Sequence, residues 1–269
     1  IFAKFRECTR KGRALIASYC VQDCVLVTRL VEKLEVLASV LSMSQITGVT
    51  PSQILWRGQG VKVMFQLCEE AHKQNYVVED TNTQGRDEIA EEDPGGYEGA
   101  TVLEPIPGFY RDPILCLDFA ALYPSLIRTA GLSIETFVED PSATTVETFR
   151  VPNTKHHFVS TNVRRGILPV ILDNLTAARK AAKRMMKEAA DDPGRRSLFN
   201  FRQLAIKISA NSVYGFTGCK TGQIVAIQVA ESTTGFGRHV IDLTSCYVQE
   251  KYGGSTTVYG DSVTGDTAL

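Results

Sequence analysis

The sequence is short of several features that would point to its class directly. Its 29 basic and 30 acidic residues leave a formal net charge of −1, so the total charge indicates no particular partner. The apolar stretch at residues 114–127 is broken by Asp118 and is too short to cross a bilayer. No signal peptide is recognised near the N-terminus. We therefore expect an intracellular protein without a membrane segment, and a piece of a longer chain.

The seven cysteines form no metal-binding or disulfide pattern. Cys20 and Cys24 are a helical turn apart, with no matching second pair and no nearby histidine, so neither a zinc site nor a disulfide framework is predicted. Several cysteines stand in apolar runs, which is typical of buried thiols in a reducing compartment. The composition, 43% apolar and 22% charged over 269 residues, is that of a globular protein of one large or two ordinary domains.

Charge is uneven along the chain even though the total is near zero. Residues 179–207 carry nine basic and three acidic side chains, whereas residues 79–98 carry eight acidic side chains and one basic one. The basic block indicates either a local site for anions such as phosphate or a solvated helix face. The acidic block, with its Asn, Gly and Pro, is expected to be a loop or linker over residues 77–100.

Apolar periodicity predicts an α+β arrangement with a helical insertion between strands. Helices are expected at residues 13–41, 53–72, 169–190, 197–216 and 223–250, the last of them loosened by Gly235 and Gly237. Strands are expected at residues 114–117, 152–160 and 255–259. His156 and His157 fall on the second of these strands, and we expect them on its edge or in a surface loop without a specific role.

Asp118 directly follows four apolar strand residues. A carboxylate there is costly to bury unless it is paired or bound to a metal; the alternative is a strand-end aspartate that caps the next turn. Tyr123 follows closely, and Pro124 stiffens the exit of this segment. Asp261 is expected at the tip of a hairpin. Two aspartates from separate strand ends can hold two divalent metals roughly 3.5–4 Å apart and so neutralise a phosphoryl transition state.

Two helical segments each place polar side chains on one face. Arg179, Lys183 and Lys187 recur at i, i+4 and i+8, where like charges repel one another unless they face an anion such as a polyphosphate. Lys207, Asn211 and Tyr214 recur at i, i+4 and i+7, a pattern that suits a phosphate, a polar edge and a base. A face turned to water, or an ordinary amphipathic helix, is the alternative in each case.

Several segments, taken in order, resemble the family B DNA polymerases over residues 13–261. "DFAALYPS" resembles the first palm motif, "KISANSVYG" the fingers motif and "VYGD" the start of the hairpin motif. "YCVQD", from Tyr19 to Asp23, resembles the third exonuclease motif. "YEGA" resembles the motif between the exonuclease and polymerase regions, and "TTGFGR" resembles a further family block.

The resemblance implies a palm whose antiparallel sheet carries the catalytic aspartates and a helical-hairpin fingers insertion, preceded by the C-terminal helix of an RNase H-like exonuclease domain. It divides the chain into the end of the 3′–5′ exonuclease domain (1–42), a linker and entry to the palm (43–110), a first palm segment (111–166), the fingers (167–218), a second palm segment (219–261) and a C-terminal segment (262–269). The implied activity is template-directed addition of dNTPs to a primer 3′-hydroxyl with two Mg²⁺ ions.

The resemblance also implies roles for individual residues. Asp118 and Asp261 are implied as the catalytic metal ligands, with the backbone carbonyl of Phe119 as a further ligand. The implied contacts to the incoming dNTP come from Ala121, Leu122, Tyr123, Arg179, Lys183, Lys207, Asn211 and Tyr214, with Tyr123 under the sugar, where it excludes ribonucleotides. Tyr19 and Asp23 keep one wall of a proofreading site, so this piece is not expected to degrade DNA. Without a thumb, it is expected to be inactive alone.

The last eight residues depart from the family pattern, which has Thr-Asp-Ser after Asp261. "SVTGDT" resembles the first block of an intein, with Ser262 as the splicing nucleophile. The alternative is a degenerate hairpin in which Asp266 replaces the missing acid, although a carboxylate moved three residues along leaves the tip of the turn. Because that acid is missing, a catalytically inactive polymerase-like module that binds nucleic acid or acts as a scaffold stays open, and a nuclease remnant is a weaker option.

The resemblance implies further partners and a location. The partners are primer–template DNA, dNTPs and, with them, a sliding clamp or other replication proteins, with no membrane. The expected location is the nucleus or a viral replication site.

Overall fold

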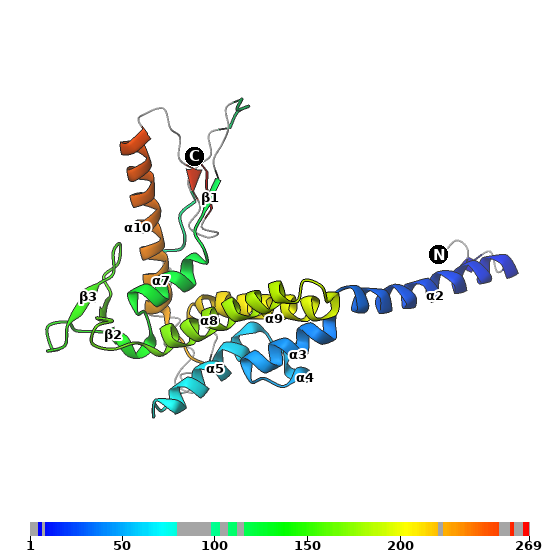
Figure 1. Ribbon diagram of the computed structural model, residues 1–269, viewed down its shortest axis with the longest axis horizontal. Helices are drawn as coiled ribbons and strands as arrows, with labels where there is room; N and C mark the ends of the chain where they lie inside the picture. The colour runs from blue at the N-terminus through cyan, green and yellow to red at the C-terminus, as the bar shows by residue number, and fades with distance from the viewer. Residues whose placement is uncertain are drawn as a thin grey trace.

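The computed structural model describes residues 5–6, 9–79, 98–102, 107–111, 116–219, 223–252, 259–260 and 266–268, with only the backbone described for Cys116 and for the residues after 252. Two long helices, α8 (Ile167–Glu188) and α9 (Pro193–Thr217), pack side by side at the centre of the molecule (Figure 1). Both were predicted from the sequence, with ends that differ by one to four residues. They are the predicted helical insertion of an α+β fold.

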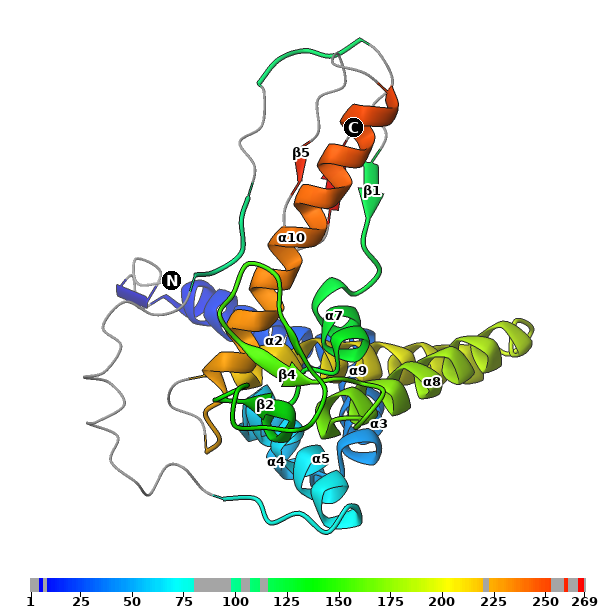
Figure 2. The same ribbon diagram turned by 90° about the vertical axis from the view of Figure 1, so that its left-hand side faces the viewer.

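Other helices surround this pair. The helices α3 (Val36–Thr47), α4 (Pro51–Trp56) and α5 (Gln59–Lys73) lie along one side, and α3 and α5 pack against α9. The helices α7 (Leu122–Ala130) and α10 (Ile227–Tyr252) stand at one end, whereas α2 (Arg10–Lys33) projects from the other (Figures 1 and 2). The core therefore forms where α5, α7, α8, α9 and α10 meet, around side chains such as Val63, Ile127, Leu172 and Val213.

The single helix predicted over residues 13–41 is wrong, because the chain breaks between α2 and α3. Glu35 takes a left-handed conformation, with φ of 44° and ψ of 47°, which is unfavourable for a residue with a Cβ. Neither Gly nor Pro stands at the break to signal it in the sequence. Tertiary packing supplies the cause: α3 packs on α9, and Ser197 of α9 donates a hydrogen bond of 2.8 Å to the Glu35 carboxylate.

The helix predicted over residues 53–72 is likewise two helices, α4 and α5. Thr50 caps the first, with its hydroxyl accepting from the Gln53 N–H, and Pro51 occupies the first turn, where a missing N–H costs nothing. Gly58 then forms the N-cap of α5. The apolar face of α5, with Val63, Leu67 and Ala71, is buried in the core.

The N-terminus of α8 is bonded to α7 and to the turn that follows it. In the 3-10 turn Ile134–Thr136, the Glu135 carboxylate accepts a hydrogen bond from the Ile167 N–H, and the Ser133 hydroxyl accepts one from the Leu168 N–H. One turn later, Asp173 pairs with both Arg128 of α7 and Arg165. The bonds from the Ile167 and Leu168 N–H groups satisfy helix-end donors that would otherwise lack partners. The pair of Asp173 with Arg128 joins α8 to α7.

A small antiparallel sheet stands beside α7. Its strands are β2 (Phe137–Val138), β3 (Thr148–Arg150) and β4 (His157–Val159), in the order β2-β4-β3. The strand predicted over residues 152–160 is thus confirmed only at its end. His156 is buried, 2.8 Å from Glu231 of α10, and its ring meets the Phe137 ring edge-on, so the expectation of a surface position without a role was wrong for this residue.

The helices α7 and α10 carry the largest departures from the sequence predictions. No helix was predicted over the segment after Asp118, but it forms α7; Pro124 lies in the first turn of this helix, where its ring is tolerated. Gly235 and Gly237 do not loosen α10, which is continuous. A Cβ at Gly235 would lie 2.4 Å from the Thr154 side chain, so this glycine lets α10 approach the β3–β4 turn.

The second sheet brings the two expected catalytic segments together. Its strands are β1 (Cys116–Asp118), β5 (Tyr259–Gly260) and β6 (Asp266–Ala268), in the order β1-β6-β5. Both pairings are antiparallel, so β1 and β5 run parallel to each other. The sheet stands beside α10 in both views (Figures 1 and 2). The predicted hairpin after residue 258 is therefore present, although its turn, residues 261–265, lies outside the described residues.

The helix α2 is long and apolar enough to cross a membrane by length and composition, with mean hydropathy of 1.5 over its most apolar window and none of that window buried. The sequence prediction missed it because charged and polar residues interrupt its apolar ones. Seven large apolar side chains are exposed along it or at its end: Leu15, Val21, Leu26, Val27, Leu30, Val31 and Leu34. The five cysteines with described side chains, two of them on α2, are exposed, so burial was the wrong expectation for these thiols.

Candidate active site

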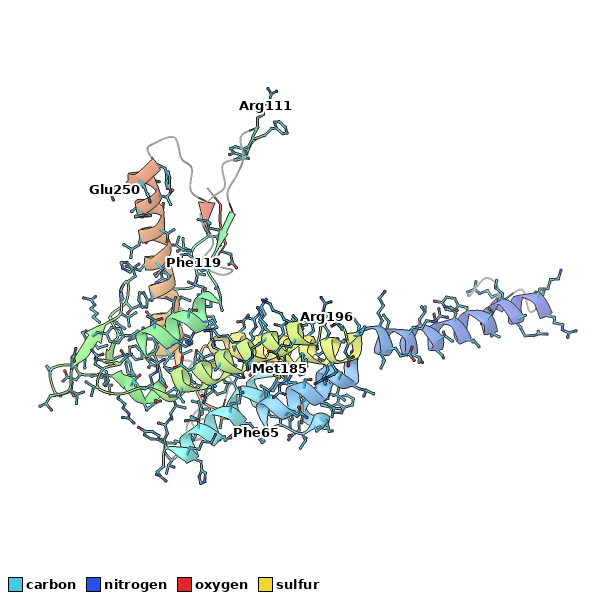
Figure 3. All side chains as sticks on the ribbon, in the orientation of Figure 1. Phe65, Arg111, Phe119, Met185, Arg196 and Glu250 are labelled. Atoms are coloured by element: carbon cyan, nitrogen blue, oxygen red, sulfur yellow. The ribbon has the colours of Figure 1, made fainter. Side chains whose placement is uncertain are left out.

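Asp118 ends strand β1 with its side chain exposed. Within the described part of the chain no hydrogen bond or ion pair engages this carboxylate, so it does not cap the following helix. Phe119 comes next, half-buried, between β1 and the start of α7 (Figure 3). The carboxylate and the following backbone carbonyl are oxygen donors of the kind that Mg²⁺ prefers.

The strand register shows how the hairpin stands relative to Asp118. Leu117 of β1 pairs with Thr267 of β6, which in turn pairs with Gly260 of β5. Asp261, the residue after β5, lies outside the described residues, so its approach to Asp118 stays a prediction. Asp266 lies opposite Asp118 in register. It has left the turn, as the sequence argument required, yet its backbone stays beside β1.

The N-terminus of α7 follows Asp118 closely in the sequence. Ala121 takes a left-handed conformation, with φ of 54°, as the N-cap, and its carbonyl accepts the first helical hydrogen bond, from the Ser125 N–H. The N–H groups of Ala121 and Leu122 therefore stand at the N-terminus of the helix. Such N–H groups at a helix N-terminus favour bound anions.

Tyr123 of α7 and Tyr214 of α9 are in direct contact. Their ring centroids are 4.4 Å apart, with an interplanar angle of 41°, within the range of favourable aromatic pairs. Both side chains are half-buried. The palm motif and the fingers motif, far apart in the sequence, therefore meet through these two rings.

Comparison with known proteins agrees with this geometry. The model of DNA polymerase family B matches residues 49–265, most of the chain. The chain belongs to DNA polymerase family B. The DNA polymerase delta catalytic subunits of Bos taurus and Dictyostelium discoideum are 41% and 38% identical to it over 93% and 94% of its length.

A solved structure supports the same assignment. The family B DNA polymerase of the hyperthermophilic archaeon Pyrobaculum calidifontis matches 97% of this chain and 32% of its own, with a TM-score of 0.75 at 27% identity. This family B chain covers 22% of the Dictyostelium relative and 23% of the bovine one. It therefore spans about a quarter of the length of the curated relatives that it matches.

The expected cations of this family B chain lie on α8 and α9. Lys207 and Asn211 are exposed on the face of α9 that also carries Tyr214. Lys183 and Lys187 are exposed on α8. Arg179 is half-buried and donates a hydrogen bond of 3.3 Å to the side chain of Gln203 on α9, so it also joins the two fingers helices.

Sequence reasoning missed a link between two of the family B motifs. Arg238 of "TTGFGR" is buried and donates hydrogen bonds to the carbonyls of Glu98 and Gly99 in "YEGA", at 3.0 and 2.6 Å. It also pairs with the Glu98 carboxylate at 3.0 Å, and the Thr234 hydroxyl donates to the Glu98 carbonyl. The sequence contains both motifs, but nothing in their spacing indicates that Arg238 contacts the "YEGA" segment.

The exonuclease-like residues stand apart from these. Tyr19 and Asp23 are one helical turn apart on α2, and both are exposed. A separate hollow of about 770 Å³ lies between α4–α5 and the end of α9; its lining includes Arg57, Phe65 and Gly215. Phe65 lies on the α5 side (Figure 3). Ser212 and Gly215, on either side of Tyr214 in the sequence, line the hollow.

Polymerases of family B depend on divalent metals. Among the residues that the structure describes, no three His, Cys, Asp or Glu side chains gather closely enough to hold an ion. Of the two aspartates expected to bind the metals, Asp118 is the one whose side chain the structure describes. Its exposed carboxylate, which no described residue engages, fits the oxygen-donor chemistry of Mg²⁺.

Proposed function

We propose that the protein containing this chain is a template-directed DNA polymerase that adds dNTPs to a primer 3′-hydroxyl, with this chain as its palm and fingers. The contact between Tyr123 and Tyr214 carries the proposal, because it unites the segment that begins at Asp118 with the fingers helix α9. Membership of family B and the free carboxylate of Asp118 support it. The activity belongs to the full-length protein.

In this proposal Asp118 and Asp261 hold two Mg²⁺ ions, with the Phe119 carbonyl as a further ligand. Bound there, the ions lower the pKa of the primer 3′-hydroxyl and neutralise charge on the transferred phosphoryl group. The residues of the chain supply positioning: strand β1 fixes the Asp118 carboxylate, and its sheet carries β5 up to Asp261. Because the hydroxyl attacks the α-phosphate directly, no covalent enzyme intermediate is required.

We assign the dNTP to the space between α7, α8 and α9. The backbone N–H groups of Ala121 and Leu122 meet the triphosphate, where the helix N-terminus favours negative charge. Arg179, Lys183 and Lys207 bind its phosphates, and Asn211 supports that contact. Tyr123 lies under the sugar and clashes with a 2′-hydroxyl, whereas Tyr214 packs near the nascent base pair.

We assign α2 to the end of a 3′–5′ exonuclease domain, with Tyr19 and Asp23 as one wall of its site. Its exposed apolar side chains then pack against the remainder of that domain. The matches to DNA polymerase delta subunits, which cover 93–97% of this chain in most cases, support this assignment. We also propose the division of the chain that the resemblance implied. It consists of the end of the exonuclease domain (1–42), the linker and entry to the palm (43–110), the first palm segment (111–166), the fingers (167–218), the second palm segment (219–261) and the C-terminal segment (262–269).

We also propose that Ser262 opens an intein. Its hydroxyl attacks the Asp261 carbonyl, and the peptide bond becomes an ester as the nitrogen of Ser262 becomes a free amine. The position of Asp266 opposite Asp118 supports the competing proposal, a degenerate hairpin. The mass of the mature protein separates the two: splicing removes the segment that starts at Ser262, whereas a degenerate hairpin retains Asp266.

Primer–template DNA, dNTPs and a sliding clamp or other replication proteins are the proposed partners, and the nucleus or a viral replication site is the proposed location. The relatives from Dictyostelium discoideum and Bos taurus are named DNA polymerase delta catalytic subunits, which favours a role in DNA replication.

The function is tested by replacing Asp118 in the full-length protein. Asp118→Ala should abolish primer extension while binding of primer–template DNA survives. Asp191→Ala, which removes an exposed acid from the turn between α8 and α9, is the matched control and should leave extension intact. Sustained extension by Asp118→Ala would reject the metal assignment, and DNA binding without extension by the unaltered protein would favour an inactive binding module.

A further inference from the structure

Gly237 of α10 lies directly behind the ring of Tyr123. Gly237 is buried, and a Cβ at this position would lie 3.5 Å from Cε1 of Tyr123 and 3.7 Å from Cδ1 of Leu126. The Tyr123 ring also meets Tyr214 of α9. It is therefore held between α10 and the fingers, and its position depends on both.

Gly235 and Gly237 of α10 lie against different parts of the molecule. A Cβ at Gly235 would collide with the Thr154 side chain at 2.4 Å, whereas a Cβ at Gly237 would be in ordinary van der Waals contact. Neither glycine has a positive φ, so backbone strain explains neither. Glycine inside a helix costs stability relative to alanine, and at Gly237 it leaves beside the Tyr123 ring the room that a side chain longer than alanine would fill.

We propose that Gly237 is a specificity-determining residue that sets the position of the Tyr123 ring and, through it, the fit of the dNTP sugar. The inference rests on the proposed function, in which Tyr123 selects the sugar. Gly237 acts as a positioning residue, because it touches the tyrosine and not the nucleotide.

Side-chain size at position 237 therefore matters. Alanine fits at 3.5 Å and adds one contact to the ring. Valine carries two methyl groups about 1.5 Å further out, and its χ1 has one strongly preferred rotamer in a helix, so it cannot turn both methyls away. Well-packed interiors do not absorb such atoms without movement. The half-buried Tyr123 is the neighbour that moves, and the space under the sugar narrows.

A double-mutant cycle in the full-length protein tests this, with single-nucleotide primer extension as the measurement. Gly237→Val should raise the KM for dNTP about tenfold with kcat little changed, and the same substitution in the Tyr123→Ala background should have less than about a twofold effect. Gly237→Ala, whose Cβ fits at 3.5 Å, should leave the KM within about twofold of that of the unaltered protein. The thermal midpoint of each variant is measured alongside.

Gly194→Ala is the control, since it also replaces a helical glycine and its Cβ would meet only the Asp192 carboxylate, at 3.5 Å; it should change neither KM nor the coupling. If Gly237→Val fails to fold, Gly237→Ser, which adds one atom beyond the Cβ, takes its place, and an unchanged KM in the variant that folds would overturn the inference. Equal effects of the position 237 variants in both backgrounds would also overturn it while the role of Tyr123 stands. Unchanged sugar selection in Tyr123→Ala would instead overturn the proposed role of Tyr123 itself.

Discussion

The rings of Tyr123 and Tyr214 lie 4.4 Å apart and join α7 to α9. Tyr123 follows the strand that ends in Asp118, and Tyr214 shares a helix face with Lys207 and Asn211. A nucleotide bound by Lys207, as we propose, would thus meet the tyrosine that follows Asp118. This relationship makes the site testable one residue at a time.

Tyr123→Ala in the full-length protein should admit ribonucleotides. Removing the ring opens the space that a 2′-hydroxyl would occupy, and selectivity against ribonucleotides should fall on the order of 100-fold, the scale at which pockets reject one extra hydroxyl. Tyr123→Phe keeps the ring and should keep the selectivity. Kinetics of single dNTP and rNTP additions measure both; identical selectivity for the alanine variant would remove Tyr123 from this role.

Lys207→Ala should weaken dNTP binding. An exposed lysine that meets a phosphate makes charge-assisted contacts worth about 1.5–3 kcal/mol, so kcat/KM should fall by roughly 10- to 100-fold, a tenfold change being about 1.4 kcal/mol. Lys207→Arg keeps the charge and should recover part of the loss. An alanine variant with unaltered kcat/KM would place the triphosphate elsewhere.

Arg238→Met should loosen the "YEGA" segment. The buried guanidinium donates to two carbonyls and pairs with Glu98, and hydrogen bonds from a charged group contribute about 1.5–3 kcal/mol. We expect a lower thermal midpoint and faster proteolytic cleavage near residues 98–100. Thr234→Val removes one hydrogen bond, from the Thr234 hydroxyl to the Glu98 carbonyl. It should lower the thermal midpoint and speed the cleavage less than Arg238→Met. If both variants were cleaved at the rate of the unaltered protein, Arg238 would not anchor the segment.

Asp173 should make the junction of α7 and α8 sensitive to acid. Burial alone would raise the pKa of Asp173, but hydrogen bonds and charge from Arg128 and Arg165 outweigh it and lower the pKa below its usual range. The stabilisation is therefore present above the unfolded pKa, about 3.9, and is lost as pH falls through the lower folded value. Since the side chain is 36% exposed, we expect no more than about 1 kcal/mol.

The measurement is denaturant unfolding of the full-length protein and of Asp173→Asn at several pH values. The stability difference between them should be constant near neutral pH and shrink below about pH 4. A difference that does not depend on pH would show that the two arginines do not hold the ionised carboxylate.

The sequence predicted the fingers helices well because each combines a long apolar period with clear ends, such as Asp192 and Pro193 at the start of α9. It failed at Glu35, where contact with Ser197 of α9, and no local signal, accompanies the break. It also failed at α7, because an aspartate, a tyrosine and a proline in a short segment suggest a turn. His156 was misplaced because its partner, Glu231, comes from a distant helix.

Within the site, motif spacing predicted which side chains share a face but not which faces meet. Lys207, Asn211 and Tyr214 follow from helical geometry alone. The contact of Tyr214 with Tyr123 and the bonds of Arg238 to "YEGA" depend on how α7, α9 and α10 pack, which the sequence pattern does not encode. Asp261 and Ser262 lie outside the described residues, so their roles stay predictions.

The most direct test of the account is the number of metal ions held beside Asp118. Electron paramagnetic resonance of Mn²⁺ bound to the full-length protein, with a chain-terminated primer, template and incoming dNTP, should show two spin-coupled ions roughly 3.5–4 Å apart. Asp118→Ala and Asp261→Ala should each lose the coupling, whereas Asp191→Ala should retain it. A coupled pair that persists in Asp118→Ala would contradict the account.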